Sequence, residues 1–238
     1  MTVLVLVYTL RSRIWVTKYC GGRSHRLEVN SVNGNIDVSF HEKLLLHTQW
    51  VKTLGKEGQQ IQVEDINLSN HNFSEINLSQ AIMPGAIFDN SILEDADLYA
   101  SNLASASFKN AKMDRVTIAK ANLDYSVLEN ASLVQANLIR TTFFEANLEK
   151  ANLTQAKLKK AMFIEANLKD TIFINCDLEM AVFNKSILSK TDFSGANLIH
   201  ADFSDAVFID CKFIQAKYDE NTKWPDDFEL SAHELIKV

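Results

Sequence analysis

The 238-residue chain is poor in the residues that interrupt regular structure and in those that build common binding motifs. It has two prolines and seven glycines, and just Gly85 and Gly195 fall within residues 66–220, so this region has no glycine-rich phosphate loop. No stretch approaches the ~20 apolar residues that span a bilayer. The apolar run at residues 2–8 lacks the basic start and the cleavage site of a signal peptide. We therefore expect a cytoplasmic protein that does not associate with membranes.

Cysteine and histidine are also scarce. Three cysteines suit a reducing compartment. Cys176 and Cys211 fall where the repeat described below requires a small inward residue, so each thiol is predicted to act as a small apolar filler. None of the six histidines has the spacing of a metal site with Cys, Asp or Glu. We expect no catalytic residues, no metal and no cofactor.

What the sequence has instead is a five-residue repeat that runs from Ile66 to Glu220 without insertion or deletion. The centres of the 31 repeats are 16 Leu, 11 Phe, two Met, one Ile and one Tyr. Two residues before each centre lies a residue that is usually small, and it is Ala in 18 repeats. The residue between them is Asn or Asp in 14 repeats, and such short polar side chains hydrogen-bond to nearby backbone at a turn.

A period of five fits neither a helix nor a continuous strand. Five helical residues advance by ~500°, so an apolar stripe would drift by ~140° per repeat. On a strand, successive centres would alternate between opposite faces, because the period of a strand is two. The chain must therefore turn once per repeat, with the small and the large residue pointing inward. One of the two must be small because protein interiors are closely packed.

Tandem Ala-Asn-Leu motifs, as at Ala121–Leu123 and Ala151–Leu153, resemble the pentapeptide-repeat family. The resemblance implies an all-β fold, a right-handed quadrilateral β-helix with four repeats per coil and about eight coils. Residues 20 positions apart then become stacked neighbours at ~4.8 Å. Burying each central Leu or Phe contributes ~1.5–3 kcal/mol, so we expect residues 64–220 to form one elongated domain.

The N-terminal side of the repeat shows the pattern of a helical cap. Ser39 and Glu42 have the spacing of a capping box, and Gly55 has the position of a helix stop. We therefore expect a capping helix within residues 39–63, a segment that resembles the N-terminal cap of many cyanobacterial members of the family. Three interpretations of residues 1–38 stay open: a strand-rich appendage, a flexible basic tail, or a segment included by an over-long start assignment.

The C-terminal segment, residues 221–238, is also predicted to be a cap. Trp224 and Phe228 lie in a Trp-Pro motif that resembles the exit from the coil in the same cyanobacterial members. Ser231 and Glu234 have the spacing of a second capping box, so we expect a short terminal helix. Because caps cover coil edges that would otherwise pair with another chain, we predict a monomer or a weak homodimer.

One corner of the predicted coil carries a basic column. Like charges stacked at ~5 Å repel each other, so stability does not explain this column. Apolar residues adjoin it, and together they form a candidate partner-binding patch for an acidic protein surface. This candidate patch consists of Lys120, Ile139, Arg140, Phe144, Lys157, Lys159, Lys160 and Ile164. The alternative is a solvated face with scattered apolar residues.

Two functions follow from these patterns. The first is a non-enzymatic scaffold that presents a rigid rod surface to an unidentified protein partner, because no insertion in the repeat encloses a dry pocket for catalysis. The second is mimicry of DNA towards a type II topoisomerase, which resemblance to the quinolone-resistance pentapeptide proteins implies. Direct nucleic-acid binding is not expected, because the net charge is −6 and phosphate contacts need a basic surface.

Overall fold

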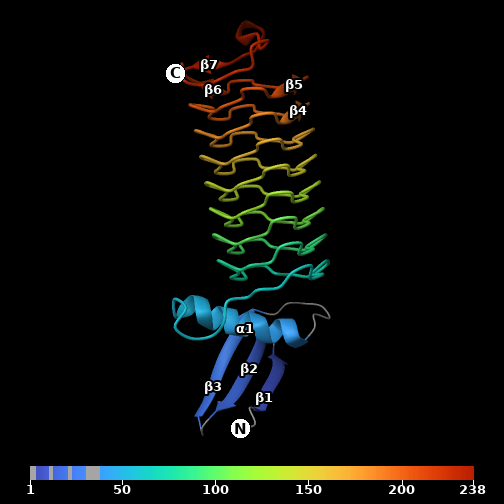
Figure 1. Ribbon diagram of the computed structural model, residues 1–238, viewed down its shortest axis with the longest axis vertical. Helices are drawn as coiled ribbons and strands as arrows, with labels where there is room; N and C mark the ends of the chain where they lie inside the picture. The colour runs from blue at the N-terminus through green and yellow to red at the C-terminus, as the bar shows by residue number, and fades with distance from the viewer. Residues whose placement is uncertain (1–3, 11–12, 21–22, 31–37) are drawn as a thin grey trace.

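The chain forms an N-terminal sheet, one α-helix and a stack of coils over the residues that the computed structural model describes, which are 4–10, 13–20, 23–30 and 38–238 (Figure 1). β1 (Leu4–Leu10), β2 (Arg13–Cys20) and β3 (Arg23–Asn30) form an antiparallel sheet in the order β1-β2-β3. The predicted N-terminal extension, residues 1–38, thus contains a three-stranded sheet.

The helix α1 (Val38–Lys52) lies across the N-terminal end of the coil stack (Figure 1). Its buried residues Phe40 and Leu44 belong to the same hydrophobic core as the coils. Because the helix begins at Val38, Ser39 lies inside the first turn. Ser39 is therefore not the predicted N-cap residue, whose backbone would be non-helical.

The predicted end of the helix is confirmed at Gly55. Beyond Lys52 the backbone turns left-handed at Leu54 and Gly55, with φ of 55° and 83°. The Gly55 amide donates to the Trp50 carbonyl oxygen over 2.8 Å, as in a Schellman motif. A glycine adopts this conformation without the steric cost that a Cβ brings.

Parallel bridges join residues 20 positions apart, so four repeats make one coil as predicted. The bridges run from Gln62–Ile82 to Asn197–Lys217. They lengthen into strands where β4 (Ile187–Ser189) pairs in parallel with β5 (Val207–Ile209). The first bridge lies one repeat before the predicted start at Ile66. Val63 occupies the central position there, and because valine is smaller than the other central residues, the sequence pattern did not reveal this repeat.

Hydrogen bonds between coils follow a fixed pattern. The amide of Phe88, a central residue, donates to the Ser107 carbonyl of the next coil over 2.7 Å, and the amide of Asn90 donates to the Lys109 carbonyl over 2.8 Å. In the opposite direction, the Ser107 amide donates to the Ala86 carbonyl over 2.9 Å. Each coil thus presents backbone amides and carbonyls that form hydrogen bonds with the coil that follows it.

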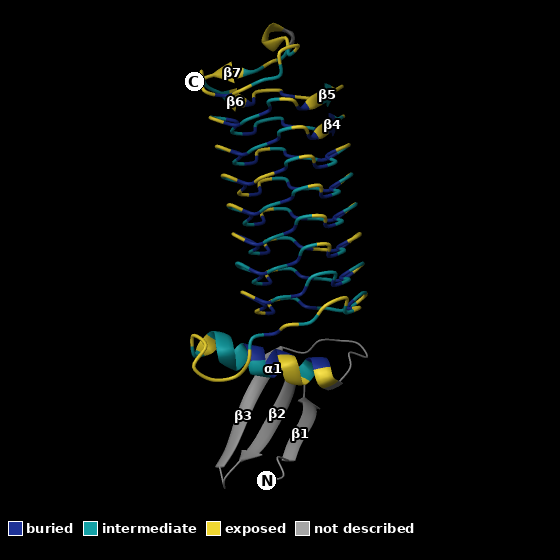
Figure 2. Ribbon diagram, viewed as in Figure 1, coloured by how far each residue is buried: buried dark blue, intermediate teal, exposed yellow. Residues whose placement is uncertain are grey.

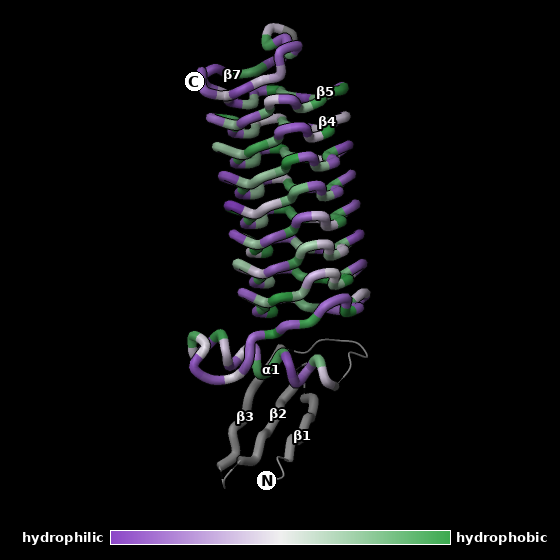
Figure 3. Tube along the Cα trace, viewed as in Figure 1, coloured by the Kyte–Doolittle hydropathy of each residue, from purple (hydrophilic) through white to green (hydrophobic). Residues whose placement is uncertain are grey.

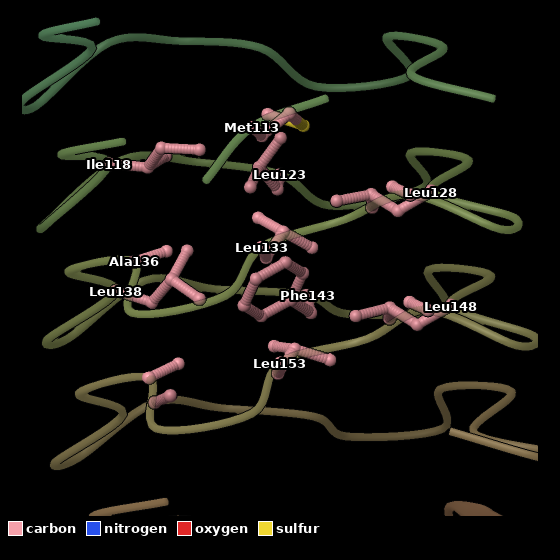
Figure 4. Close-up of a cluster of buried hydrophobic side chains, with 14 of the residues drawn as sticks. Met113, Ile118, Leu123, Leu128, Leu133, Ala136, Leu138, Phe143, Leu148 and Leu153 are labelled. Atoms are coloured by element: carbon pink, nitrogen blue, oxygen red, sulfur yellow. The ribbon is translucent and has the colours of Figure 1, made fainter. Parts of the chain in front are cut away.

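The core lies inside the coils, where every central residue from Leu68 to Phe203 is buried (Figure 2). Central residues 20 positions apart lie in neighbouring coils on the same side of the stack, as Figure 4 shows for Leu128 and Leu148. In the C-terminal half, phenylalanine rings stack face to face. The ring centroids of Phe183 lie 5.0 Å from Phe163 and 4.6 Å from Phe203. The stacked phenylalanine rings thus continue the buried core through the C-terminal half of the stack.

Each corner of the coil repeats one backbone conformation. The residue two positions after each centre from Leu68 to Phe213 is left-handed, with φ between 51° and 62° where it is not glycine. At Pro84-Gly85 the Ala86 amide closes the turn on the Met83 carbonyl, and φ of 67° at Gly85 fits the predicted type II turn. Figure 3 shows hydrophilic segments at many of these corners.

The predicted role of the Asn and Asp residues is confirmed throughout the repeat. In each of the 14 repeats, the side-chain oxygen accepts a hydrogen bond from the amide two residues later, as when the Thr154 amide donates to the Asn152 Oδ1 over 3.0 Å. This amide points to the outside of the coil and has no partner in the next coil. The side chain therefore replaces a missing backbone acceptor.

One extra residue shifts the frame at the C-terminal end. Asp202 bridges Lys223, which lies 21 positions later instead of 20. Thr222 then takes the small position and donates its hydroxyl to the Leu198 carbonyl oxygen over 3.0 Å. Trp224 takes the central position and stacks on Phe203, with 5.2 Å between the ring centroids.

The predicted C-terminal helix is wrong. Residues Leu230–Ala232 form η1, a single 3-10 turn, and Ser231 lies inside this turn instead of preceding a helix. The chain then extends as β7 (Ile236–Lys237), which pairs in parallel with β6 (Lys217–Tyr218). The open amides and carbonyls of β6 favour a strand there, and this pairing outweighs the local capping spacing.

Candidate functional site

The basic column of the candidate patch is built by the corners of three successive coils. The Lys120 amide donates to the Ile139 carbonyl over 2.9 Å, and the Arg140 amide donates to the Lys159 carbonyl over 3.0 Å. These bonds hold Lys120, Arg140 and Lys160 in register, and all three are left-handed and exposed. The structure thus brings together the three cations that the 20-residue offset predicts.

The apolar part of the patch lies on the adjoining side of the coil. The Glu145 amide donates to the Ile164 carbonyl over 3.0 Å, which stacks Phe144 below Ile164. Both side chains are half-buried, as is Ile139 beside the basic column. The patch therefore combines a row of exposed cations with a partly covered apolar strip.

Two of the cations already have partners within the chain. The Lys120 ammonium donates to the Tyr99 hydroxyl over 2.8 Å, and the Lys159 ammonium lies 2.7 Å from a Glu179 carboxylate oxygen. By contrast, no ion pair involves Arg140, Lys157 or Lys160 in the part of the chain that the structure describes. The uncompensated charge of the patch is therefore carried by these three residues.

The structure adds Tyr125 to the patch, a residue that the sequence analysis missed. Its ring meets Phe144 edge to face with 5.4 Å between the centroids, and 52% of the residue is exposed. Met162, which is 40% exposed, lies between the basic and the apolar part along the chain. Tyr125 lies 19 positions before Phe144, so an offset of 19 instead of 20 would have found this contact.

A second titratable group lies outside the patch, at the joint between α1 and the first coil. His47 is fully buried, and its Nδ1 accepts a hydrogen bond from the Ile61 amide over 3.1 Å. Its Nε2 is buried without a hydrogen-bond partner. Desolvation by burial lowers the pKa of His47 to about 4, although the backbone near Ser79 raises it in part. The neutral imidazole is therefore part of the packed joint.

The cysteines inside the repeat serve the packing of the coil. The Cys176 thiol is buried and donates to the Leu153 carbonyl, and burial raises the pKa of Cys176 to about 12. Cys211 makes the same contact to the Leu188 carbonyl in the last coil but is only half-buried. In other repeats a threonine occupies the same position and its hydroxyl makes the equivalent hydrogen bond, as when the Thr171 hydroxyl donates to the Leu148 carbonyl. The neutral thiol is thus a packing group at Cys176.

The residues that the structure describes contain no group of three or more His, Cys, Asp or Glu side chains arranged to hold a metal ion. Among their helices, none is both long and apolar enough to cross a membrane.

Comparison with protein families places the repeat clearly. A model described as pentapeptide repeats (8 copies) matches residues 63–95, 91–124 and 121–159. A model described as a pentapeptide repeat region matches residues 146–222. Together the matches span residues 63–222, which is more than half of the chain and nearly all of the coil. No curated protein matches the sequence.

Solved structures of pentapeptide-repeat proteins are similar to the chain at low sequence identity and with low TM-scores. HetL from the cyanobacterium Nostoc sp. strain PCC 7120, a pentapeptide repeat protein involved in regulating heterocyst differentiation, is 20% identical, with a TM-score of 0.30; the match covers 72% of this chain and 82% of HetL. The pentapeptide repeat protein alr5209 from Nostoc PCC 7120 is 26% identical over 48% of this chain and 84% of its own, with a TM-score of 0.35. QnrB1, a plasmid-mediated fluoroquinolone resistance protein, is 14% identical over 76% and 94%, with a TM-score of 0.40.

Proposed function

Because the chain belongs to the pentapeptide-repeat family, we propose that it is a non-enzymatic scaffold that presents a rigid surface to a protein partner. The observation that carries the proposal is the uncompensated charge of Arg140, Lys157 and Lys160 beside a half-buried apolar strip. A column of like charges costs stability, so a contribution to binding explains it better than a contribution to folding. The expected partner is a protein with an acidic surface.

The rigidity of the coil supports this function. Each corner of the patch is held by backbone hydrogen bonds to the next coil, so the spacing of the cations is set before a partner arrives. Preorganised groups lose little conformational entropy on binding. Complementary charge speeds association and selects the partner, while aromatic residues such as Tyr125 and Phe144 supply contact area.

The non-enzymatic and cytoplasmic parts of the proposal rest on the repeat itself. No insertion interrupts residues 66–220, so the repeat has no loop that would enclose a substrate and exclude water. The free thiols of Cys176 and Cys211 suit a reducing compartment.

The charge distribution disfavours the alternative of DNA mimicry. A mimic needs acidic groups spread along the rod in place of phosphates. Within the repeat, residues 66–200 carry 15 acidic and 12 basic residues, and residues 201–220 carry five acidic and two basic residues. The acidic excess along the rod is therefore small, half of it lies in the last 20 residues of the repeat, and the patch interrupts the middle of the rod with positive charge.

A comparison of three baits in a pull-down from the lysate of the source organism tests the scaffold proposal. One bait is the native chain, and the second carries Arg140→Glu, Lys160→Glu and Phe144→Asp in the patch. The third is a control with Lys150→Glu, Lys190→Glu and Ile174→Asp, which makes the same change of charge and polarity at equivalent repeat positions on two other sides of the coil.

We expect a protein that the native and control baits retain and that the patch variant loses, with identical circular dichroism for all three baits. Equal retention by the native and the patch variant would show that the patch is an ordinary solvated face. The proposal would then lose its main support.

A further inference from the structure

The C-terminal end of the coil has an unpaired edge at β5. In earlier coils the central amide and the amide two residues later donate to the following coil. In the part of the chain that the structure describes, the amides of Phe208 and Asp210 donate to no backbone carbonyl, and the Ala206 carbonyl accepts no backbone amide. Such an edge offers the hydrogen-bonding groups of a missing strand.

The chain itself shows that a segment outside the repeat can occupy this kind of edge. β6 lies two sides further along the same coil, and the C-terminal tail pairs with it. The Ile236 amide donates to the Ala216 carbonyl over 2.9 Å, and the Val238 amide donates to the Tyr218 carbonyl over 3.0 Å. These bonds add β7 to β6 as a parallel strand. The tail thus covers β6 and leaves β5 open.

A cavity of about 500 Å³ lies between the β5 edge and the C-terminal tail. Its apolar lining includes Val207, Phe208 and Phe213 from the coil and Phe228 from the tail. Val207 and Ile209 are 50% and 49% exposed on the edge strand itself. The edge therefore combines free backbone groups with apolar surface, which are the two elements of β-strand addition.

The charge of this end favours a basic occupant. Asp210, Asp227 and Glu229 line the cavity, and Asp205 and Asp226 line a neighbouring hollow beside Trp224. Neither lining contains Lys or Arg. Residues 201–238 carry a net charge of −5, against −6 for the whole chain. A second copy meeting this end through the same surface would bring two acidic ends together, which costs energy.

We propose that the β5 edge binds an extended segment of a basic partner protein, which pairs with Val207–Ile209 as a parallel strand. An apolar side chain of the segment enters the cavity beside Phe208, and its basic side chains face Asp210, Asp227 and Glu229. This site is separate from the candidate patch and does not depend on the patch having a partner. The chain is a monomer when the edge is free.

A synthetic peptide tests this site directly. The probe is a fluorescein-labelled peptide with two tandem copies of the basic repeat Ala-Lys-Leu-Lys-Gly. Ala and Leu supply the small and the central residue that each repeat of a further coil would have. We expect saturable binding to the native chain by fluorescence anisotropy, weakening as salt increases. N-methylation of each lysine between Ala and Leu removes the amide that pairs with the Ala206 carbonyl, and we expect about tenfold weaker binding.

Two protein variants in one column provide the matched control. Asp210→Lys changes the open edge, whereas Asp170→Lys makes the same charge change at the same corner position two coils away. We expect Asp210→Lys to weaken peptide binding about tenfold and Asp170→Lys to leave it within about twofold.

Three outcomes would overturn the proposal. Equal weakening by both variants would show general charge attraction, and equal binding of the corresponding tandem Ala-Glu-Leu-Glu-Gly peptide would remove the basic specificity. A native dimer in light scattering that Val207→Lys dissociates would assign the edge to a second copy.

Discussion

Individual corner residues show how a regular stack tolerates unfavourable backbone conformations. Lys120 and Glu145 are left-handed, with φ of 61° and 51°, a conformation that costs a residue with a Cβ about 1–2 kcal/mol. Glycine avoids this cost, yet only Gly85 and Gly195 occupy this corner position. The hydrogen bonds to the coils on either side hold the other corners in place.

At Gly195 we expect a measurable steric effect. A Cβ there would lie 2.2 Å from the Asn175 Oδ1 of the preceding coil, and φ is +70°. Gly195→Ala should therefore lower the free energy of unfolding by about 1–2 kcal/mol in chemical denaturation. The same change in an Asn175→Gly background should cost less, because the clashing oxygen is gone. An equal cost in both backgrounds would show that the contact with Asn175 plays no part.

At the scale of elements, the sequence predicts what local patterns determine. The stop at Gly55 is correct because it depends on one residue that turns left-handed at low cost. In the structure α1 starts one residue before its predicted start. The first coil starts one repeat before the predicted one, because Val63 is smaller than the central residues that define the pattern. The C-terminal helix is wrong because the spacing of Ser231 and Glu234 says nothing about the open edge of β6, where the tail pairs instead.

The joint between α1 and the first coil should be sensitive to acid. The pKa of His47 falls from its ordinary 6.5 to about 4 because burial disfavours the imidazolium. Between these values the unfolded state takes up a proton that the folded state does not, so stability present above pH 6.5 is lost as the pH falls towards 4. We expect the circular dichroism of the helix at 222 nm to be lost at lower urea concentrations as the pH is lowered from 6.5 to 4.

His47→Asn is the control for this joint. A side-chain oxygen replaces Nδ1 as the acceptor for the Ile61 amide, and the titrating group is removed. The pH dependence of the helical signal between 6.5 and 4 should be smaller in the variant than in the native chain. The same dependence in both would show that other groups control the stability of the joint.

At the scale of the whole molecule, the coil is a one-dimensional array in which each coil contacts its neighbours. The 20-residue offset therefore predicts every column of the core and the alignment of Arg140 with Lys160. It does not predict that the Lys120 ammonium donates to the Tyr99 hydroxyl, which lies 21 positions earlier, because the choice among exposed partners depends on side-chain conformation. Nor does it predict the open edge at β5, since one extra residue after the repeat decides which sides the tail covers.

This arrangement predicts that damage to the core stays local. Phe183 stacks between Phe163 and Phe203, so Phe183→Ala should lower the free energy of unfolding by about 3–5 kcal/mol. Because coils stabilise each other through neighbours, amide hydrogen exchange should accelerate most in the coils of Phe163 and Phe203. Leu103→Ala, in the same column four coils away, should accelerate exchange around Met83 and Leu123 instead. Uniform acceleration along the stack in both variants would mean that the coils open only as one unit, and a nearest-neighbour description would then fail.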